Sequence, residues 1–243
     1  MSAATGETLV VIPTYNERES LPGVLERLFM TLPEVSALVV DDGSPDGTGL
    51  LADRLRERHP SLSVLHRDQK HGLGPAYIAG FEWGEAHGFR YLVEMDADGS
   101  HLPEQLPHLL AAAGENRLVL GSRWVRGGTI VNWPWYRSSL SHAASIYSRL
   151  MLGLGQRDVT SGYRVIPVTA LRALRLDEAA SHGYCFQIDV LRRAVAAGLD
   201  VTEVPITFVE RENGRSKMDL SIIVEAVLRV TAWGMQRMLP TRR

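Results

Sequence analysis

Two carboxylates stand two positions apart, Asp96 and Asp98, directly after the apolar run YLVEM. Carboxylate oxygens are the ligands that Mg²⁺ and Mn²⁺ prefer, and side chains at this spacing can reach one ion together. A cation held there would neutralise a diphosphate and stabilise it as a leaving group. An Asp-x-Asp pair alone is common in turns, so its place at the end of a predicted strand is what favours a metal site.

A second acidic segment, DDGSPDGT at 41–48, follows the apolar run ALVV. Its glycines and proline permit a tight turn, and Asp46 or Thr48 can cap the helix that comes next. We expect that the turn does not need Asp41 or Asp42. Their carboxylates are therefore predicted to accept hydrogen bonds from a base or a ribose, as in other nucleotide-binding sheets.

Charge is unevenly distributed along the 243 residues, although the formal net charge is only −2. Residues 1–116 carry 8 Lys and Arg against 18 Asp and Glu, whereas residues 117–172 carry 8 against 1. All the positive charges of the second block are arginines, because Lys70 and Lys217 are the only lysines. Arginine makes forked contacts with phosphate, so we predict a cation site in the first block and anion sites in the second. A solvated arginine-rich face is the alternative.

Several other chemistries are excluded. Cys185 is the only cysteine, which excludes an internal disulfide framework and a multi-thiolate metal site. There is no P-loop or nucleophile-elbow motif. The segment from Gly72 begins like a dinucleotide fingerprint, but Tyr77 stands at its third glycine position. The histidines show no metal-ligand spacing, and the N-terminus lacks the features of a signal peptide.

The elements that must position these residues follow from periodicity. Short apolar runs alternate with amphipathic stretches in the first half, which is typical of a mainly parallel sheet covered by helices. The predicted strands are 8–12, 37–40, 61–65, 91–95 and 118–120, and the predicted helices are 21–32, 50–58, 76–87 and 103–113. Ligands of such sheets bind at the carboxyl ends of the strands, where both acidic segments lie. For the second half we predict loops at 121–137 and 158–164, helices at 138–152, 186–197 and 220–238, and a strand at 201–209.

The last helix does not cross a membrane on this prediction. Glu225, Arg229 and Arg237 interrupt it, so its uncharged runs fall far short of the ~20 residues that a span needs. Its predicted apolar face comprises Leu220, Ile223, Val224, Val227, Leu228, Thr231 and Met235. A helix of this kind could lie in a membrane interface. Packing on the sheet or on another subunit is the alternative, and both stay open.

Seven short motifs run through the chain in order. They are PTYNE at 13–17, VDDGSPDGT at 40–48, GLG at 72–74, MDADGSHLPE at 95–104, GSR at 121–123, SGYR at 161–164 and FVERENGRSK at 208–217. Together they resemble the dolichyl-phosphate (polyprenyl-phosphate) mannosyltransferases, which are inverting glycosyltransferases of the GT-A fold. The resemblance implies one α/β domain over 1–243, with a nucleotide-sugar-binding half at 8–120, an acceptor half at 121–218 and a C-terminal amphipathic helix at 219–243.

The resemblance also implies a role for each motif. The donor would be GDP-mannose, held by Pro13, Tyr15, Glu17, Val40, Asp42, Ala97, Arg123, Arg211 and Lys217. The metal, Mg²⁺ or Mn²⁺, would be held by Asp96, Asp98 and Ser100, the last through a water because relatives often carry the longer Gln there. The phosphate of a polyprenyl (dolichyl-type) acceptor would be bound by Arg123, Arg137 and Ser141, and the residues central to catalysis would be Asp98, Arg123 and Arg137.

The implied reaction needs no strong general base, because a phosphate monoester has a second pKa of roughly 6. Catalysis then consists of aligning two anionic groups and screening their repulsion, a task assigned to Arg123, Arg126, Arg137 and Arg164. The expected product is polyprenyl phosphate mannose, made at the cytoplasmic face of a membrane with or without a small anchoring subunit, and with no nucleic acid partner. The alternatives are a related enzyme with another donor, such as UDP-glucose, and a non-catalytic subunit of a membrane complex.

Overall fold

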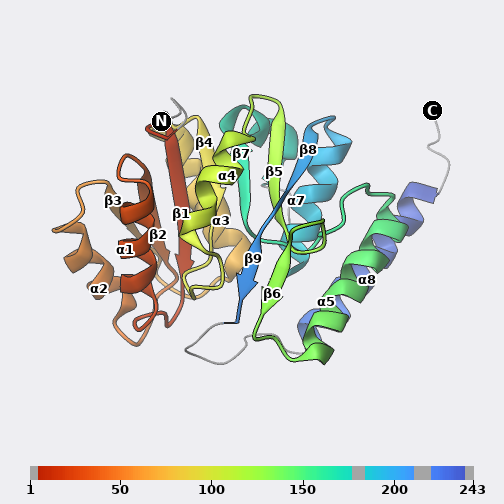
Figure 1. Cartoon of the computed structure of the whole chain (residues 1–243), viewed down its shortest axis with the longest axis horizontal. Helices are drawn as coiled ribbons and strands as arrows, with labels where there is room; N and C mark the ends of the chain where they lie inside the picture. The colour runs from red at the N-terminus through yellow and green to blue at the C-terminus, as the bar shows by residue number, and fades with distance from the viewer. Residues whose placement is uncertain (1–4, 177–183, 211–219, 239–243) are drawn as a thin grey trace.

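The centre of the protein is a seven-stranded sheet with helices on both faces (Figure 1). The computed structural model describes residues 5–176, 184–210 and 220–238. The strands are β1 (Thr8–Thr14), β2 (Ser36–Asp41), β3 (Leu62–His66), β4 (Tyr91–Glu94), β5 (Arg117–Ser122), β6 (Thr129–Val131), β7 (Arg164–Pro167), β8 (Asp200–Pro205) and β9 (Thr207–Val209). The helices are α1 (Leu21–Thr31), α2 (Thr48–Arg56), α3 (Leu73–Ala86), α4 (Leu106–Ala111), α5 (Trp135–Leu152), α6 (Leu171–Leu174), α7 (Tyr184–Ala196) and α8 (Leu220–Met238), with 3-10 turns η1 (Pro103–Gln105) and η2 (Val168–Ala170).

The strand order of the main sheet is β3-β2-β1-β4-β7-β5-β8. Neighbouring strands pair in parallel except at β7, which is antiparallel to both β4 and β5. Strands β6 and β9 form a separate parallel pair. The prediction of a mainly parallel sheet flanked by helices is confirmed, and strands from both predicted halves of the chain share this sheet.

Strand β1 shows why the apolar runs become central strands. Leu9 and Val11 belong to the apolar cluster that includes side chains of α3 and α7, whereas Val10 and Ile12 belong to the cluster that includes side chains of α1 and α4. Successive side chains of a strand point to opposite faces, so a strand covered on both faces has a continuous apolar sequence.

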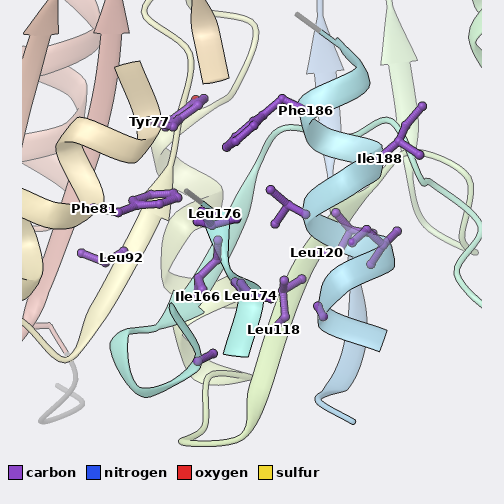
Figure 2. Close-up of a cluster of buried hydrophobic side chains, with 14 of the residues drawn as sticks. Tyr77, Phe81, Leu92, Leu118, Leu120, Ile166, Leu174, Leu176, Phe186 and Ile188 are labelled. Carbon is purple, nitrogen blue, oxygen red and sulfur yellow. The ribbon is translucent and has the colours of Figure 1, made fainter. Parts of the chain in front are cut away.

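Helix α3 lies very close to the sheet. A Cβ atom at Gly80 would collide with the side chain of Val11, and one at Gly84 would stand 2.5 Å from Leu92 Cδ2. These glycines let the helix approach β1 and β4. Figure 2 shows the cluster beneath it, in which Tyr77 of α3 points toward Phe186 of α7 with ring centroids 6.2 Å apart.

Three predictions for the second half are wrong, and one strand was not predicted. The loop predicted at 121–137 contains β6, a three-residue strand that periodicity cannot detect, and β7 was not predicted at all. The strand predicted at 201–209 divides at Ile206, because β8 pairs with β5 whereas β9 pairs with β6. Helix α5 begins at Trp135, three residues earlier than predicted, since the extended residue Pro134 directly precedes it and ends the loop.

Helices α5 and α8 lie side by side at one end of the molecule (Figure 1). Tyr147 Oη lies 2.6 Å from Thr231 Oγ1, and a Cβ at Gly234 would lie 2.7 Å from Met151 Cε. Both contacts run in the same direction along the two helices, so the pair is parallel. No helix in the described part of the chain meets the length and hydropathy that a membrane span requires.

Much of the predicted apolar face of α8 is on the surface of the protein. Val224, Val227, Leu228 and Met235 of that face are exposed, whereas Val230, which lies off it, is buried. The side chains of Leu220 and Ile223 lie outside the described part. The helix thus packs on α5 and α7 with one side and leaves an apolar row on its surface.

Candidate active site

The turn after β4 carries the two predicted metal ligands. Asp96 and Asp98 are half-buried and line the same pocket, of about 60 Å³, while Ala97 between them is buried. Gly99 completes the turn at φ 78°, a conformation that favours glycine. The carboxyl end of a central strand therefore presents both carboxylates to one space, as the sequence predicted.

Neighbouring side chains fix these carboxylates. Asp98 Oδ1 accepts hydrogen bonds from the Ser100 backbone amide at 3.0 Å and from Ser100 Oγ at 2.6 Å. Tyr77 Oη donates to Asp96 Oδ1 at 3.4 Å. The hydroxyl of Ser100, predicted to reach the metal through a water, is thus placed to orient Asp98.

His101 is a positioning residue that the sequence analysis did not single out. Its Nδ1 accepts the backbone amide of Asp96 at 3.0 Å, so the ring proton of the neutral form is on Nε2. Burial lowers the pKa of His101 to about 4. The ring stacks on Tyr163 at 4.8 Å and meets the edge of Phe208 at 5.5 Å. His101 therefore ties the Asp96 turn to β9, and its presence in the motif SHLPE is the signal that could have revealed it.

The donor set fits a hard divalent cation. In the described part of the chain, no group of three or more His, Cys, Asp or Glu side chains could enclose a metal. Mg²⁺ needs no such enclosure, because it keeps several waters and is commonly held by one or two carboxylates together with substrate phosphates. Asp96 and Asp98 supply such carboxylates, and the hydrogen bonds to Asp98 orient its oxygens as ligand-supporting contacts do.

The loops after β1 and β2 meet at the same edge of the sheet. Pro13 pairs in register with Val40. The Glu17 backbone amide donates to Thr48 Oγ1 at 3.0 Å, and the Lys70 ammonium lies 4.1 Å from the centre of the Tyr15 ring. The residues predicted to hold guanosine are thus brought together.

The carboxylates of Asp42 and Asp41 both accept hydrogen bonds that stabilise loops. Asp42 Oδ1 accepts from Arg67 Nη1 at 2.6 Å, and its Oδ2 accepts the amides of His71 and Gly72, each at 2.8 Å. Asp41 accepts the amide of Ser44 at 3.1 Å, so the expectation that the turn does not need Asp41 is wrong. The structure therefore gives Asp42 three protein donors, which shape the loop beside the predicted nucleoside site.

The N-cap residue of α2 is Gly47, and neither Asp46 nor Thr48 holds that position, although Asp46 still binds the first amide of the helix. Asp46 Oδ1 accepts the backbone amide of Thr48, the first residue of α2, at 2.9 Å. Burial raises the pKa of Asp46, but the hydrogen bonds from Thr48 and from the Arg18 amide together outweigh it, so the net pKa is below its usual value.

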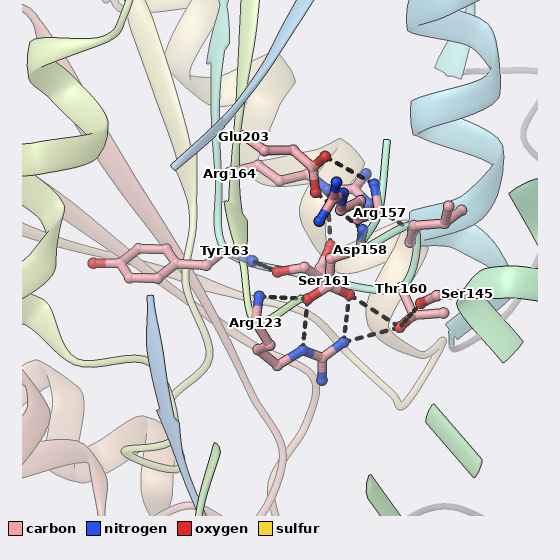
Figure 3. Close-up of polar contacts among 10 residues, drawn as sticks. Arg123, Ser145, Arg157, Asp158, Thr160, Ser161, Tyr163, Arg164 and Glu203 are labelled. Carbon is pink, nitrogen blue, oxygen red and sulfur yellow. Dashed lines mark hydrogen bonds and ion pairs between the residues drawn. The ribbon is translucent and has the colours of Figure 1, made fainter. Parts of the chain in front are cut away.

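The guanidinium of Arg123 is held in a forked ion pair beside the turn of Asp96 and Asp98. Its Nε and Nη2 donate to the two oxygens of Asp158 at 2.8 and 2.7 Å, and Nη2 also donates to Thr160 Oγ1 at 2.9 Å (Figure 3). Asp158 is buried and is held in turn by β8, since its backbone amide donates to Glu203 Oε1 at 3.0 Å. Arg123 lines the pocket of Asp96 and Asp98.

Arg137, in the first turn of α5, lines the same pocket. Its Nη1 lies 2.6 and 2.7 Å from the oxygens of Glu210, and its guanidinium lies 4.6 Å from the centre of the Trp133 ring. Arg123 and Arg137 also line a second pocket, of about 120 Å³, together with Ser141. The rest of that lining is mostly apolar: Trp133, Leu140, Ala144, Tyr147, Ser148, Thr160, Ile188, Ala226, Val227 and Val230.

Arg164 corrects one prediction, because it cannot screen phosphates. It is fully buried at the start of β7, where its Nε donates to the Ser161 carbonyl at 2.9 Å and lies 3.8 Å from Glu94 Oε2. Burial raises the pKa of Glu94 to about 7, against the pull of the Arg164 charge. Arg126 is exposed and lines neither pocket. Arg211 and Lys217 lie outside the described residues.

Comparison with known proteins identifies the family of the chain. Residues 9–175 match the model of glycosyl transferase family 2. The chain is 54% identical over 242 residues to polyprenol monophosphomannose synthase of Mycolicibacterium smegmatis, covering 98% of this chain and 91% of that one. It is 56% identical over 227 residues to undecaprenyl-phosphate mannosyltransferase of Micrococcus luteus, covering 93% of each.

The fold is shared with more distant enzymes of known structure. Glucosyl-3-phosphoglycerate synthase of Mycobacterium tuberculosis, solved with Mn²⁺ and UDP-glucose, has a TM-score of 0.67 at 21% identity, covering 99% of this chain and 81% of that one. Its complex with Mn²⁺, UDP and phosphoglyceric acid has a TM-score of 0.66. This likeness confirms the predicted GT-A fold. The family match and the two close relatives together show that the chain belongs to glycosyl transferase family 2.

Proposed function

We propose that the protein transfers mannose from GDP-mannose to a polyprenyl monophosphate, with inversion at the sugar carbon. One observation carries the proposal: a polar pocket lined by Asp96 and Asp98 adjoins a mostly apolar pocket, and Arg123 and Arg137 line both. Such a pair of pockets suits a nucleotide diphosphate sugar on one side and the phosphate of a lipid on the other. The names of the two close relatives support this acceptor class.

The donor side would bind a divalent cation through Asp96 and Asp98, and Mg²⁺ and Mn²⁺ both suit these ligands. When bound, the cation offsets negative charge on the leaving diphosphate. The loops of Pro13, Tyr15 and Asp42 adjoin this edge and suit a nucleoside. Mn²⁺ in the structural relative is consistent with this cofactor class.

The acceptor side explains why a strong base is unnecessary. A lipid monophosphate is mostly dianionic near neutral pH, so one of its oxygens is already a nucleophile. Arg123, whose guanidinium is fixed on Asp158, and Arg137 would align that phosphate and screen it from the diphosphate. A single displacement from the face opposite the leaving group gives inversion.

The second pocket suits the first isoprene units of the acceptor. Its apolar lining includes Leu140 and Ala144 of α5, Val227 and Val230 of α8, and Ile188 of α7. An apolar wall directly beside two arginines matches a molecule with a hydrocarbon chain attached to a phosphate.

The surface of α5 and α8 suits a peripheral position on a membrane, which we propose to be the cytoplasmic face. Large apolar side chains are exposed on both helices: Trp135, Tyr136, Leu140, Ile146, Leu150, Val224, Val227, Leu228 and Met235. Exposed rows of this kind mark interaction surfaces, and amphipathic helices bind the boundary between headgroups and acyl chains.

This surface gives a prediction for membrane binding. The double variant Leu150→Glu/Leu228→Glu is expected to bind anionic phospholipid vesicles at least tenfold more weakly in a sedimentation assay, because burying each leucine contributes roughly 1.5–3 kcal/mol. Leu50→Glu is the matched control, since Leu50 is equally exposed on α2, away from this surface. Equal loss of binding by the control would contradict the assignment.

The transfer assay tests the function itself. Purified protein is incubated with labelled GDP-mannose and a short polyprenyl phosphate, with and without Mg²⁺ or Mn²⁺. We expect a labelled polyprenyl phosphate mannose only when metal is present, with the β configuration that inversion of the α-linked donor produces. Transfer from UDP-glucose in place of GDP-mannose, or retained configuration, would refute the proposed donor or stereochemistry.

A further inference from the structure

The contact between Arg137 and Glu210 lies in the wall of the active-site pocket. Both oxygens of Glu210 lie on Arg137 Nη1, at 2.6 and 2.7 Å, and both residues line the pocket that contains Asp96 and Asp98. The two side chains are largely buried, with exposed fractions of 14% and 22%. A bond between charged partners with so little water around it is a strong one.

Each partner is held in place by separate contacts. Arg137 lies 4.6 Å from the centre of the Trp133 ring, which supports the guanidinium plane from one side. The Glu210 backbone amide donates to the Val131 carbonyl at 3.0 Å, next to the β6–β9 pair. Glu210 is therefore not required to keep Arg137 facing the pocket, and the carboxylate can leave the guanidinium without unfolding the strand.

The charges around the pocket show what this pair does before substrate binds. The pocket is lined by three carboxylates and two guanidiniums, those of Asp96, Asp98, Glu210, Arg123 and Arg137. Arg123 is paired with Asp158, and Arg137 is paired with Glu210. An incoming phosphate therefore has to compete for arginines that already contact carboxylates.

We propose that Glu210 is an internal anion that occupies the acceptor-phosphate position on Arg137 and is exchanged for the substrate phosphate. This inference rests on the proposed function, which places the acceptor phosphate at Arg137. A phosphate monoester carries about −1.5 to −2 charges and three acceptor oxygens, so it displaces a single carboxylate. A lipid with a carboxylate or a hydroxyl in place of the phosphate does not. Glu210 thus sets a charge threshold for the acceptor.

The test is the binding of a short, water-soluble isoprenyl monophosphate, measured by calorimetry without donor at fixed ionic strength. Glu210→Gln is expected to bind it more tightly than the wild type, on the order of tenfold, because the competing charge-assisted contact is gone. Inorganic phosphate is the second probe and should show the same gain at lower absolute affinity. If Glu210 instead positions Arg137, the Gln variant will bind both probes more weakly. Weaker or unchanged binding overturns the proposal.

Glu104→Gln is the matched control, because it removes the same charge from an exposed ion pair with Arg27. Binding by this variant should equal that of the wild type, and an equal gain would show a general charge effect and refute the role of Glu210. The Arg137→Ala variant should bind the isoprenyl monophosphate weakly, both with the native Glu210 and in combination with Glu210→Gln. Since no donor is present, a protein that passes these tests but transfers no mannose would refute the proposed function alone.

Discussion

Asp98→Asn should lower mannose transfer on the order of 10³-fold while the folded protein stays as stable as the wild type. The substitution removes one of the two charged ligands proposed for the cation, and stabilisation of a leaving group by a metal contributes several kcal/mol. The new amide oxygen can still accept the hydrogen bond that Ser100 Oγ donates to Asp98 at 2.6 Å. Initial rates at saturating Mg²⁺, together with thermal unfolding, measure both parts of this prediction.

A matched variant separates the role of Asp98 from a general loss of charge. Asp53→Asn removes a carboxylate from a surface pair with His66, away from the pocket, and should transfer mannose at the wild-type rate. Titration with Mn²⁺ in the presence of GDP should show weaker metal binding for Asp98→Asn only. Full activity of the Asp98 variant would contradict the assigned metal site.

Asp158→Ala is expected to have the second largest effect, and its primary effect should be a lower free energy of unfolding. Asp158 is fully buried and accepts the Arg123 amide at 2.8 Å as well as both arms of the guanidinium. Its loss leaves a buried charge without compensation, which costs about 3–5 kcal/mol of unfolding free energy. Urea denaturation measures this change, and transfer should fall with it because Arg123 loses its fixed orientation.

A double variant distinguishes the structural part from the chemical part. Arg123→Met/Asp158→Leu replaces the ion pair by apolar side chains, an exchange that is often close to neutral for stability. We expect it to recover part of the unfolding free energy, since the Arg123 backbone amide still loses its acceptor, but to transfer no mannose. Recovery of activity along with stability would show that Arg123 acts only in the fold.

The local part of this architecture was predictable, and the reasons can be traced to particular residues. Runs such as Leu9–Ile12 are buried on both faces, so they mark central strands without further information. Asp96 and Asp98 follow such a run, and a parallel sheet brings ligands to that end of its strands. The carboxylates of the turn after β4 could therefore be placed from the sequence.

The sequence did not show which arginines line the pocket and which are buried within the fold. Arg123 and Arg164 each end a short motif, GSR and SGYR, yet Arg123 lines the pocket whereas Arg164 is buried beside Glu94 within the sheet. The difference arises because β7 inserts between β4 and β5, a pairing between segments far apart in the chain. The sequence analysis also missed Glu210, the partner of Arg137. Glu210 follows β9 directly and is far from Arg137 in the chain.

The insertion of β7 has a consequence for the order in which the protein can be assembled during its synthesis. Strand β4, which leads into the turn of Asp96 and Asp98, pairs with β1 on one side. Its other neighbour, β7, is made later, with Pro167 opposite Tyr91 and Arg164 opposite Glu94. Until those residues leave the ribosome, β4 is an edge strand with unpaired backbone groups, which are a template for association with other chains. The acidic first half of the nascent chain carries an excess of carboxylates, and their mutual repulsion protects this open edge while it waits for its partner.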